Sequence, residues 1–151
     1  MAKIVKCNSD DYAALTEIWE RSVRATHGFL TEDDIMEIKQ SLGSAYFPNV
    51  ELYAVEDGGI PAGFIGLSGG TIEMLFIDSD RRGLGYGSML MDFAVCRGAV
   101  RVDVNEQNPS ALAFYRAKGF RVVCRDATDE AGRPYPILHL ALEVNGGQRG
   151  L

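Results

Sequence analysis

The pattern of apolar and polar residues divides the chain into strands and helices. Short alternating runs favour strands, and apolar residues three and four positions apart favour helices. Strands are predicted at residues 2–7, 52–56, 63–68, 71–77, 100–104, 120–124 and 137–143. Helices are predicted from residue 12 to 26, from 32 to 42, from 88 to 97 and from 109 to 118.

The order of these elements predicts an α/β fold of mixed α+β type. One strand and two helices come first. The next three strands are joined by the turns Asp57-Gly58-Gly59 and Gly69-Gly70, which is typical of an antiparallel meander. Helices then connect the strands at 71–77, 100–104 and 120–124. A strand–helix–strand connection joins parallel strands, so strands 71–77 and 100–104 are expected to run parallel.

The stretch that organises the chain is TIEMLFIDSDRRGLGYGS, residues 71–88. A strand leads through a glycine-rich turn into a helix. The first N–H groups of a helix have no partner inside it, and the helix dipole adds positive charge at the same point. Glycines let the backbone come close to an anion. This arrangement predicts a phosphate-binding site, and the alternative is an ordinary glycine-rich connection.

The glycine spacing distinguishes between phosphate ligands. A P-loop requires Gly-Lys-Ser/Thr, which does not follow here. The dinucleotide pattern G-x-G-x-x-G fails, because its third glycine falls on Ser88. The pattern R-x-x-G-x-G fits, from Arg82 to Gly87. Within it, the side chain of Tyr86 is expected to be simply exposed.

Composition predicts one globular domain at residues 1–144, with a disordered tail at 145–151. The net charge is −6 with a pI near 4.9, which argues against binding nucleic acid. The start of the chain has no apolar leader and no run is long enough to span a membrane, so we expect a cytoplasmic protein without membrane partners. The three cysteines have no metal-ligand spacing, and we interpret them as reduced and mostly buried.

A second motif follows the glycines and is more specific. It reads Asn105-x-x-Asn108-x-x-Ala111-x-x-Phe114-Tyr115-x-x-x-Gly119-Phe120. With the first motif and the element order, it resembles the GNAT superfamily of N-acetyltransferases. Residues 19–30 and 133–138 resemble the YjaB-like branch of bacterial GNATs. Many members have proline where this chain has Ser79.

The resemblance implies a fold and a cofactor. The fold is a mostly antiparallel twisted sheet of about six to seven strands, with parallel strands 4 and 5 splayed apart and about four flanking helices. The gap admits the pantetheine of acetyl-CoA. The backbone of Leu75, Phe76 and Ile77 would bond the pantetheine and the acetyl carbonyl, and Asn108 would lie beside it. The pyrophosphate would be held by Arg82, Gly83, Leu84, Gly85, Tyr86, Gly87 and Ser88.

The implied reaction moves an acetyl group from a thioester to an amine. An alkyl ammonium group has a pKa near ~10, so only about one amine molecule in a thousand is neutral at pH 7. The reaction needs a route for that proton, donors for the oxyanion and an acid for the thiolate. By its motif position Tyr115 is the expected acid, although helix packing also explains an aromatic there. Asn108 is equally well explained as a helix N-cap.

Three residues are candidates for the base. Glu73 lies on the central strand, where it could act directly or through water, or form a salt bridge. Asp103, on strand 100–104, is a weaker candidate. His27 ends the first helix, and its pKa range suits proton transfer or acceptor binding; contact with the last helix carbonyls is the alternative. Direct attack by a neutral amine needs none of the three.

The sequence leaves several alternatives open. The leading hypothesis is direct acetyl transfer in a ternary complex without a metal, and the alternatives are a non-catalytic CoA or acyl-CoA sensor and an enzyme for longer acyl groups. The acceptor amine could be an amino acid, polyamine, aminoglycoside, peptide N-terminus or protein lysine. A homodimer is one option for the oligomeric state. A structural role is expected for His139. Four residues are candidates to line the acceptor pocket, with core packing as the alternative for each and the preferred one for Trp19: Trp19, Thr26, Phe29 and Leu30.

Overall fold

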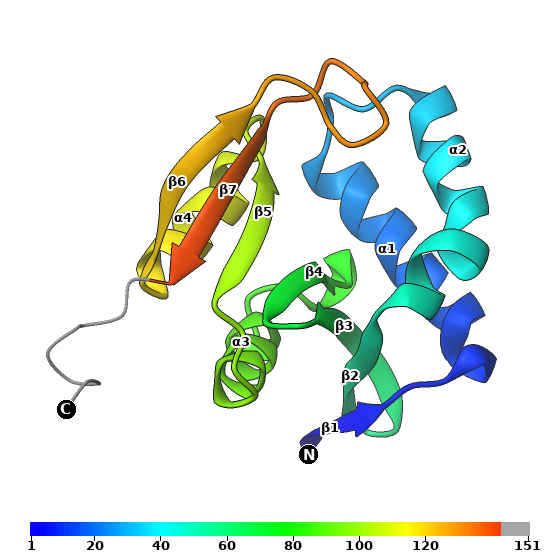
Figure 1. Cartoon of the computed structure of the whole chain (residues 1–151). Helices are drawn as coiled ribbons and strands as arrows, with labels where there is room; N and C mark the ends of the chain where they lie inside the picture. Colours follow the sequence, from blue (N-terminus) through cyan, green and yellow to red (C-terminus); the bar gives the residue numbers. More distant parts are fainter. Residues whose placement is uncertain (143–151) are drawn as a thin grey trace, which may run out of the picture. The chain divides into compact units, whose positions relative to one another are not determined.

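The computed structural model describes residues 1–142, and the expected tail at 145–151 lies outside the described residues. The chain forms two compact units, Met1–Ala99 and a second that begins at Val100 (Figure 1). The single domain at 1–144 therefore stays a prediction. No helix among the described residues is both long enough and apolar enough to cross a membrane.

The first unit contains four strands in spatial order, each antiparallel to its neighbour. They are β1 (Ala2–Lys6), β2 (Glu51–Asp57), β3 (Ile60–Ser68) and β4 (Thr71–Ile77). The two turns of this meander need glycine, because Gly58, Gly59, Gly69 and Gly70 all have positive φ. These strands and turns confirm the predicted meander.

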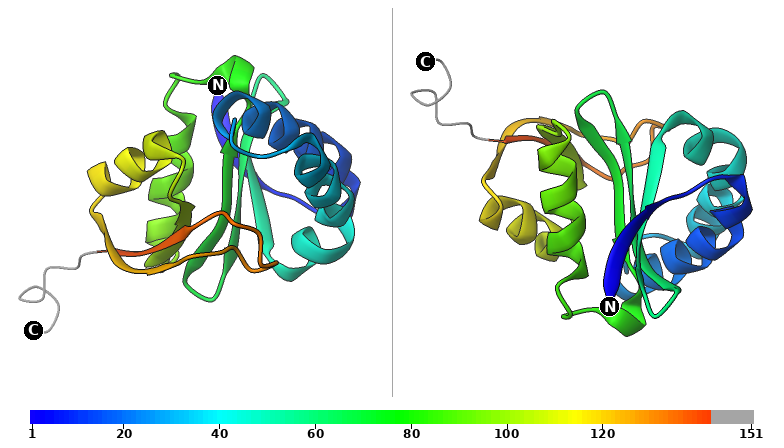
Figure 2. Two further views of the ribbon diagram at one scale, coloured as in Figure 1. Left: turned by 90° about the horizontal axis from the view of Figure 1, so that it is seen from above. Right: turned by 90° about the horizontal axis from the view of Figure 1, so that it is seen from below.

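Helices cover both faces of this four-stranded sheet. They are α1 (Tyr12–Thr26), α2 (Glu32–Ser41) and α3 (Tyr86–Cys96). Figure 2 shows α1 and α2 on one face of the strands and α3 on the other. Successive side chains of a strand point to opposite faces of the sheet. Phe64 of β3 packs in the core beneath α1, whereas Tyr53 of β2 contacts Phe93 of α3 on the other face. β4 is consequently held between two helical layers.

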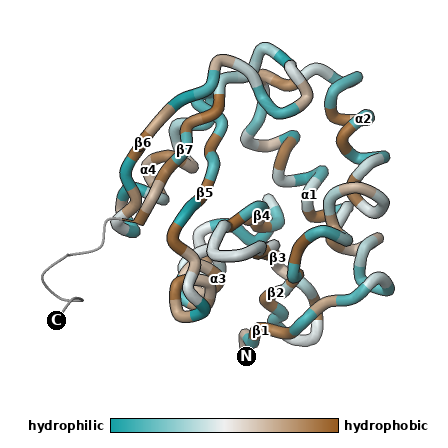
Figure 3. The backbone as a smooth tube through the Cα atoms, viewed as in Figure 1, coloured by the Kyte–Doolittle hydropathy of each residue, from teal (hydrophilic) through white to brown (hydrophobic). Residues whose placement is uncertain are grey.

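The helices are amphipathic, as the spacing of their apolar residues predicts. Figure 3 shows apolar and polar segments alternating along α1 and α2. On α1 the buried residues include Leu15, Ile18 and Trp19, so Trp19 is a core residue as expected. The sequence predicted that the helical segment of α2 ends at Gly43, and this prediction is wrong. The chain continues through a π-helical turn (Leu42–Tyr46) and a 3-10 turn (Phe47–Asn49), because buried Leu42 and Phe47 keep the segment on the core.

The second unit contains β5 (Arg101–Asn105), α4 (Pro109–Ala117), β6 (Phe120–Asp126) and β7 (Ile137–Leu142). Its strands are antiparallel in the order β5-β7-β6. Alternate residues of β5 and β7 are buried, namely Val102, Val104, Leu138 and Leu140. Asn108 and Pro109 begin α4, and Gly119, with φ 98°, follows its end, all as predicted.

Candidate functional site

The glycine loop, residues 82–87, connects the end of β4 to α3. A 3-10 turn (Ser79–Arg81) leads into it, and α3 begins at Tyr86 with Gly85 as N-cap. Gly83 and Gly85 have φ of 78° and 88°, a region that only glycine enters at low cost. Both glycines are exposed, and a Cβ added to either would meet no heavy atom within 4 Å beyond its chain neighbours. These positions therefore require glycine for backbone conformation, with room above the loop for a ligand.

The start of α3 presents backbone donors beside this loop. The N–H of Met89 donates to the Gly85 carbonyl at 3.1 Å, which is the first hydrogen bond of the helix. The N–H groups of residues 86–88 precede it and have no acceptor inside the helix. The helix dipole places positive charge at the same end, and the side chain of Arg82 is exposed nearby in the chain. This combination suits a phosphate or pyrophosphate group.

The side chain of Tyr86 is not exposed as the sequence predicted. It is only 6% exposed, and its hydroxyl donates to Asp57 Oδ2 at 2.6 Å. The ring turns inward because Tyr86 begins α3 on the face that packs on the sheet. Leu84 is the exposed large side chain of the loop, at 62%. Only the backbone of Tyr86 is thus available to a ligand as the motif implies.

A bidentate ion pair lies before the 3-10 turn that leads into the loop, where β4 stops. Arg21 of α1 donates from Nε and Nη2 to the two carboxylate oxygens of Asp78, at 3.0 and 2.7 Å. Asp78 also accepts from the N–H of Asp80, and its own N–H donates to the Ala62 carbonyl. Arg21, more than any other group, holds the pKa of Asp78 below its usual range. Sequence reasoning missed this pair, because its partners are 57 residues apart.

The predicted pantetheine strand is β4. Its residues Leu75, Phe76 and Ile77 pair with β3 on one side. Glu73 falls at a register shift between the pairs Gly66–Met74 and Leu67–Ile72, and it is exposed.

His27 follows α1 and lies beside β4. Its ring centroid is 6.4 Å from that of Phe76 and 5.3 Å from that of Phe29. Burial lowers the pKa of His27 from 6.5 to about 4, so the imidazole is neutral at pH 7. The Thr26 hydroxyl donates to the Ser22 carbonyl and lies 2.8 Å from His27 Nδ1. The neutral ring carries one hydrogen, on Nδ1 or on Nε2 according to the tautomer.

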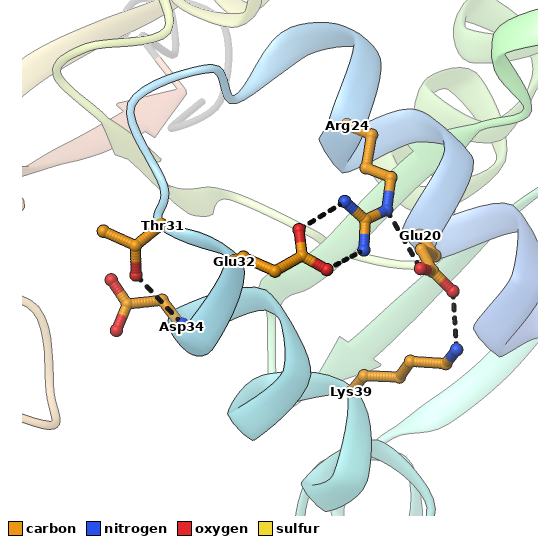
Figure 4. A network of polar contacts seen from close by, with 6 residues as sticks. All are labelled: Glu20, Arg24, Thr31, Glu32, Asp34 and Lys39. Carbon is orange, nitrogen blue, oxygen red and sulfur yellow. Dashed lines mark hydrogen bonds and ion pairs between the residues drawn. The ribbon is translucent and has the colours of Figure 1, made fainter.

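A charged network braces the loop that contains His27. Arg24 of α1 binds both carboxylate oxygens of Glu32 at 2.7 Å and also binds Glu20. Lys39 binds the other oxygen of Glu20 at 2.6 Å. Figure 4 shows these contacts joining α1 to α2, with Thr31 capping α2 through the N–H of Asp34. The network ties the two helices together on either side of residues 27–31.

The second unit carries the two residues of the specific motif. Asn108 is buried, and its Oδ1 accepts from the N–H of Ala111 at 3.2 Å, so the cap role is confirmed. Tyr115 is also buried, with its ring 5.9 Å from Phe120 and 5.3 Å from Phe114. Burial raises the pKa of Tyr115 above its ordinary value. Its hydroxyl is therefore protonated at neutral pH.

The remaining candidates are engaged elsewhere. Asp103 contacts Nδ1 of His139 at 2.6 Å, and Asp126 contacts Nε2 at the same distance. His139 thus bridges β5 and β6, in keeping with the structural role expected for it. The prediction that the cysteines are mostly buried is wrong: Cys7 is buried, whereas Cys96 and Cys124 are exposed at the end of α3 and on β6. Helix and strand periodicity did not reveal which way these two thiols point.

The chain is similar to known acetyltransferases. A family model described as "Acetyltransferase (GNAT) domain" matches residues 48–122. Peptidyl-lysine N-acetyltransferase YjaB of Salmonella typhimurium is 40% identical over 142 residues, which cover 93% of this chain and 97% of YjaB. The solution structure of apo YjaB from Escherichia coli superposes with a TM-score of 0.88 at 36% identity, covering 96% of this chain and 99% of that one.

A more distant structure shares the fold. The PaiA N-acetyltransferase from Thermoplasma acidophilum, solved in complex with coenzyme A, has a TM-score of 0.71 at 19% identity. The match covers 92% of this chain and 98% of that one. Together the two structures confirm the predicted fold class, an α/β fold with a mixed sheet.

Proposed function

The chain belongs to the YjaB-like branch of the GNAT acetyltransferase family, and from this premise we propose that it acetylates the ε-amine of lysine in a peptide or protein. Family membership makes it an N-acetyltransferase. The observation that carries the choice of acceptor is the 40% identity, over almost the whole chain, to a protein named peptidyl-lysine N-acetyltransferase. The lysine ammonium is a cation, in keeping with the net charge of −6.

Acetyl-CoA is the proposed acyl donor, and the glycine loop is its anchor. The pyrophosphate binds the N–H groups of residues 83–88, with Arg82 supplying a positive side chain. The pantetheine follows β4, where the backbone of Leu75, Phe76 and Ile77 offers hydrogen bonds. Asn108 bonds the pantetheine while it caps α4. The positive φ of Gly83 and Gly85 supports this assignment.

The transfer is direct, within a ternary complex. The neutral amine attacks the thioester carbonyl carbon, the new C–N bond forms and the C–S bond breaks. The nitrogen gives its second proton to water, and the departing sulfur is protonated so that CoA leaves as the thiol. Tyr115 presents its O–H to the departing sulfur as the general acid. Because burial keeps this phenol protonated, the donor is present across the neutral pH range.

The amine reaches the thioester without its extra proton. An imidazole with a pKa of about 4 is too weak a base to take a proton from an ammonium of pKa near 10. His27 therefore orients the amine and does not take its proton. Exposed Glu73, at the bulge of β4, passes the ammonium proton to water.

Matched peptides test this function. The first peptide has one internal lysine and an acetylated N-terminus, and the second has a free N-terminus and an Nε-acetylated lysine. Release of the CoA thiol from acetyl-CoA should depend on enzyme with the first peptide and stay at background with the second. The reverse preference would make the protein an N-terminal acetyltransferase, and background rates with both would reject peptide amines as acceptors.

A further inference from the structure

We propose that Arg21 and Asp57 are positioning residues, which hold the two ends of the glycine loop in the conformation that binds acetyl-CoA. Arg21 acts through Asp78, which caps the 3-10 turn that leads into the loop, and Asp57 acts through Tyr86 near the end of the loop. The inference rests on the proposed role of the loop as the pyrophosphate site. Neither residue belongs to either motif, and neither touches the loop's exposed glycines.

The first anchor fixes the point where the chain leaves β4. The Asp78 side chain is 10% exposed and accepts two hydrogen bonds from Arg21, whose side chain is 44% exposed. The Asp78 carbonyl accepts from the N–H of Arg81 at 2.8 Å and closes the 3-10 turn. Without Arg21 a largely buried carboxylate would keep only the N–H of Asp80, which leaves an unbalanced charge. The turn would then change conformation to expose Asp78 to water.

The second anchor fixes the first residue of α3. The Tyr86 hydroxyl donates to Asp57 Oδ2 at 2.6 Å, a short bond of the charge-assisted kind. Asp57 is the last residue of β2, directly before the glycine turn into β3. The bond thus ties the amino end of α3 to the rigid end of a hairpin, 29 residues away in the chain.

Two anchors matter because the loop between them is intrinsically flexible. Gly83 and Gly85 are exposed, and glycine has more backbone freedom to lose on ordering than any other residue. A loop that is already ordered before the ligand arrives spares that loss on binding. The anchors should therefore strengthen CoA binding without touching CoA. They should not alter the chemical step once acetyl-CoA saturates the enzyme.

The test is calorimetric titration of CoA at a temperature where each variant is folded. Arg21→Gln and Asp57→Ala should each weaken the affinity about tenfold, which is ~1.4 kcal/mol. Arg21→Lys, which keeps the charge and one donor, and Asp57→Asn, which keeps an acceptor oxygen, should recover part of it. The rate constant kcat at saturating acetyl-CoA should stay near that of the wild type, so that only KM changes.

Arg24→Gln is the matched control. Arg24 also lies on α1 and makes a bidentate ion pair, its side chain is 39% exposed, and its partners are on α1 and α2 rather than at the loop. This variant should bind CoA as the wild type does. If Arg24→Gln lowers the affinity for CoA as much as Arg21→Gln does, the effect comes from a general loosening of α1 and the proposal is wrong.

The outcomes separate this inference from the proposed function. Gly85→Asp places an anionic side chain in the loop itself and should abolish CoA binding. If Gly85→Asp loses binding while Arg21→Gln and Asp57→Ala bind normally, the loop is the site but the anchors do not position it. If the wild type does not bind CoA, the proposed function fails first. Should Arg21→Gln not fold, Arg21→Lys and Asp57→Ala decide the question in the same way.

Discussion

The imidazole of His27 lies beside the phenyl ring of Phe76, with 6.4 Å between the ring centroids. This contact places the end of α1 against the strand on which we propose that the thioester lies. The same surroundings keep the imidazole neutral, because burial lowers its pKa to about 4. A neutral histidine beside β4 does not repel a lysine ammonium that approaches the site.

The depressed pKa of His27 predicts a specific loss of stability in acid. An unfolded chain takes up the histidine proton near pH 6.5, whereas the folded protein resists it until about pH 4. Stability from this group is therefore complete above pH 6.5 and is lost as the pH falls toward 4. His27→Gln should remove that part of the pH dependence. Urea unfolding of both proteins across the window measures it, and parallel curves would show that His27 titrates normally.

His139 should behave in the opposite sense. The hydrogen bonds that His139 donates to Asp126 and then to Asp103 raise its pKa above 6.5. Its contribution to stability is therefore complete below pH 6.5 and is lost as the pH rises through the folded pKa. The difference in unfolding free energy between wild type and His139→Gln should be larger at about pH 5 than at about pH 9. An equal difference at both values would mean that the two carboxylates do not hold a charged imidazole.

Replacement of Gly85 should separate binding from folding. At φ 88° a side chain costs about 1–2 kcal/mol, which a folded domain tolerates. Gly85→Asp also brings a negative charge to the proposed pyrophosphate site, so CoA binding should disappear while the circular dichroism spectrum stays native. Gly28→Asp, at an open position with ordinary φ, is the control and should bind CoA normally. Undiminished affinity in Gly85→Asp would reject the loop as the site.

Loss of the Tyr115 hydroxyl should slow the chemical step. Removing a general acid typically costs about 10²–10⁴-fold in rate, so Tyr115→Phe should lower kcat on that scale and leave KM for acetyl-CoA nearly unchanged. Tyr46→Phe removes a hydroxyl from an exposed tyrosine and should have no effect. A normal rate for Tyr115→Phe would leave Tyr115 with only a packing role among Phe114 and Phe120.

Substitution of Asn108 should distinguish its two roles. Asn108→Ala removes the acceptor for the N–H of Ala111 and should cost about 1 kcal/mol of stability, as helix caps do. Asn108→Asp keeps a capping oxygen but removes the amide donor that we assign to the pantetheine. It should recover the stability and still bind acetyl-CoA more weakly than the wild type. If Asn108→Asp has both the stability and the acetyl-CoA affinity of the wild type, Asn108 acts only as a helix cap.

Local patterns predicted most of the fold. The strand at residues 71–77, the meander turns at Gly58 and Gly69, and the start of α4 at Asn108 all lie where the sequence places them. Each depends on neighbours in the chain, either through turn chemistry or through side-chain periodicity. The family was recognisable for a similar reason, because both motifs are short and contiguous.

Contacts between distant residues were not predictable in this way. Nothing in the spacing of Arg21 and Asp78 marks them as partners, and the burial of Tyr86 depends on Asp57 being at the end of another strand. The neutral state of His27 likewise follows from burial that only the folded chain creates. The chemistry of a candidate residue could be inferred from its type, but its protonation state required its surroundings.

The most direct test of the central claim is thermal unfolding of the wild-type protein with acetyl-CoA. A ligand at about 100 times its dissociation constant adds ~2.7 kcal/mol to the stability of the folded state. Acetyl-CoA and CoA should therefore raise the melting temperature clearly, whereas NADH and ATP at the same concentration should raise it much less. An unchanged melting temperature with acetyl-CoA, at concentrations up to the millimolar range, would contradict the assignment of the glycine loop as the acetyl-CoA site.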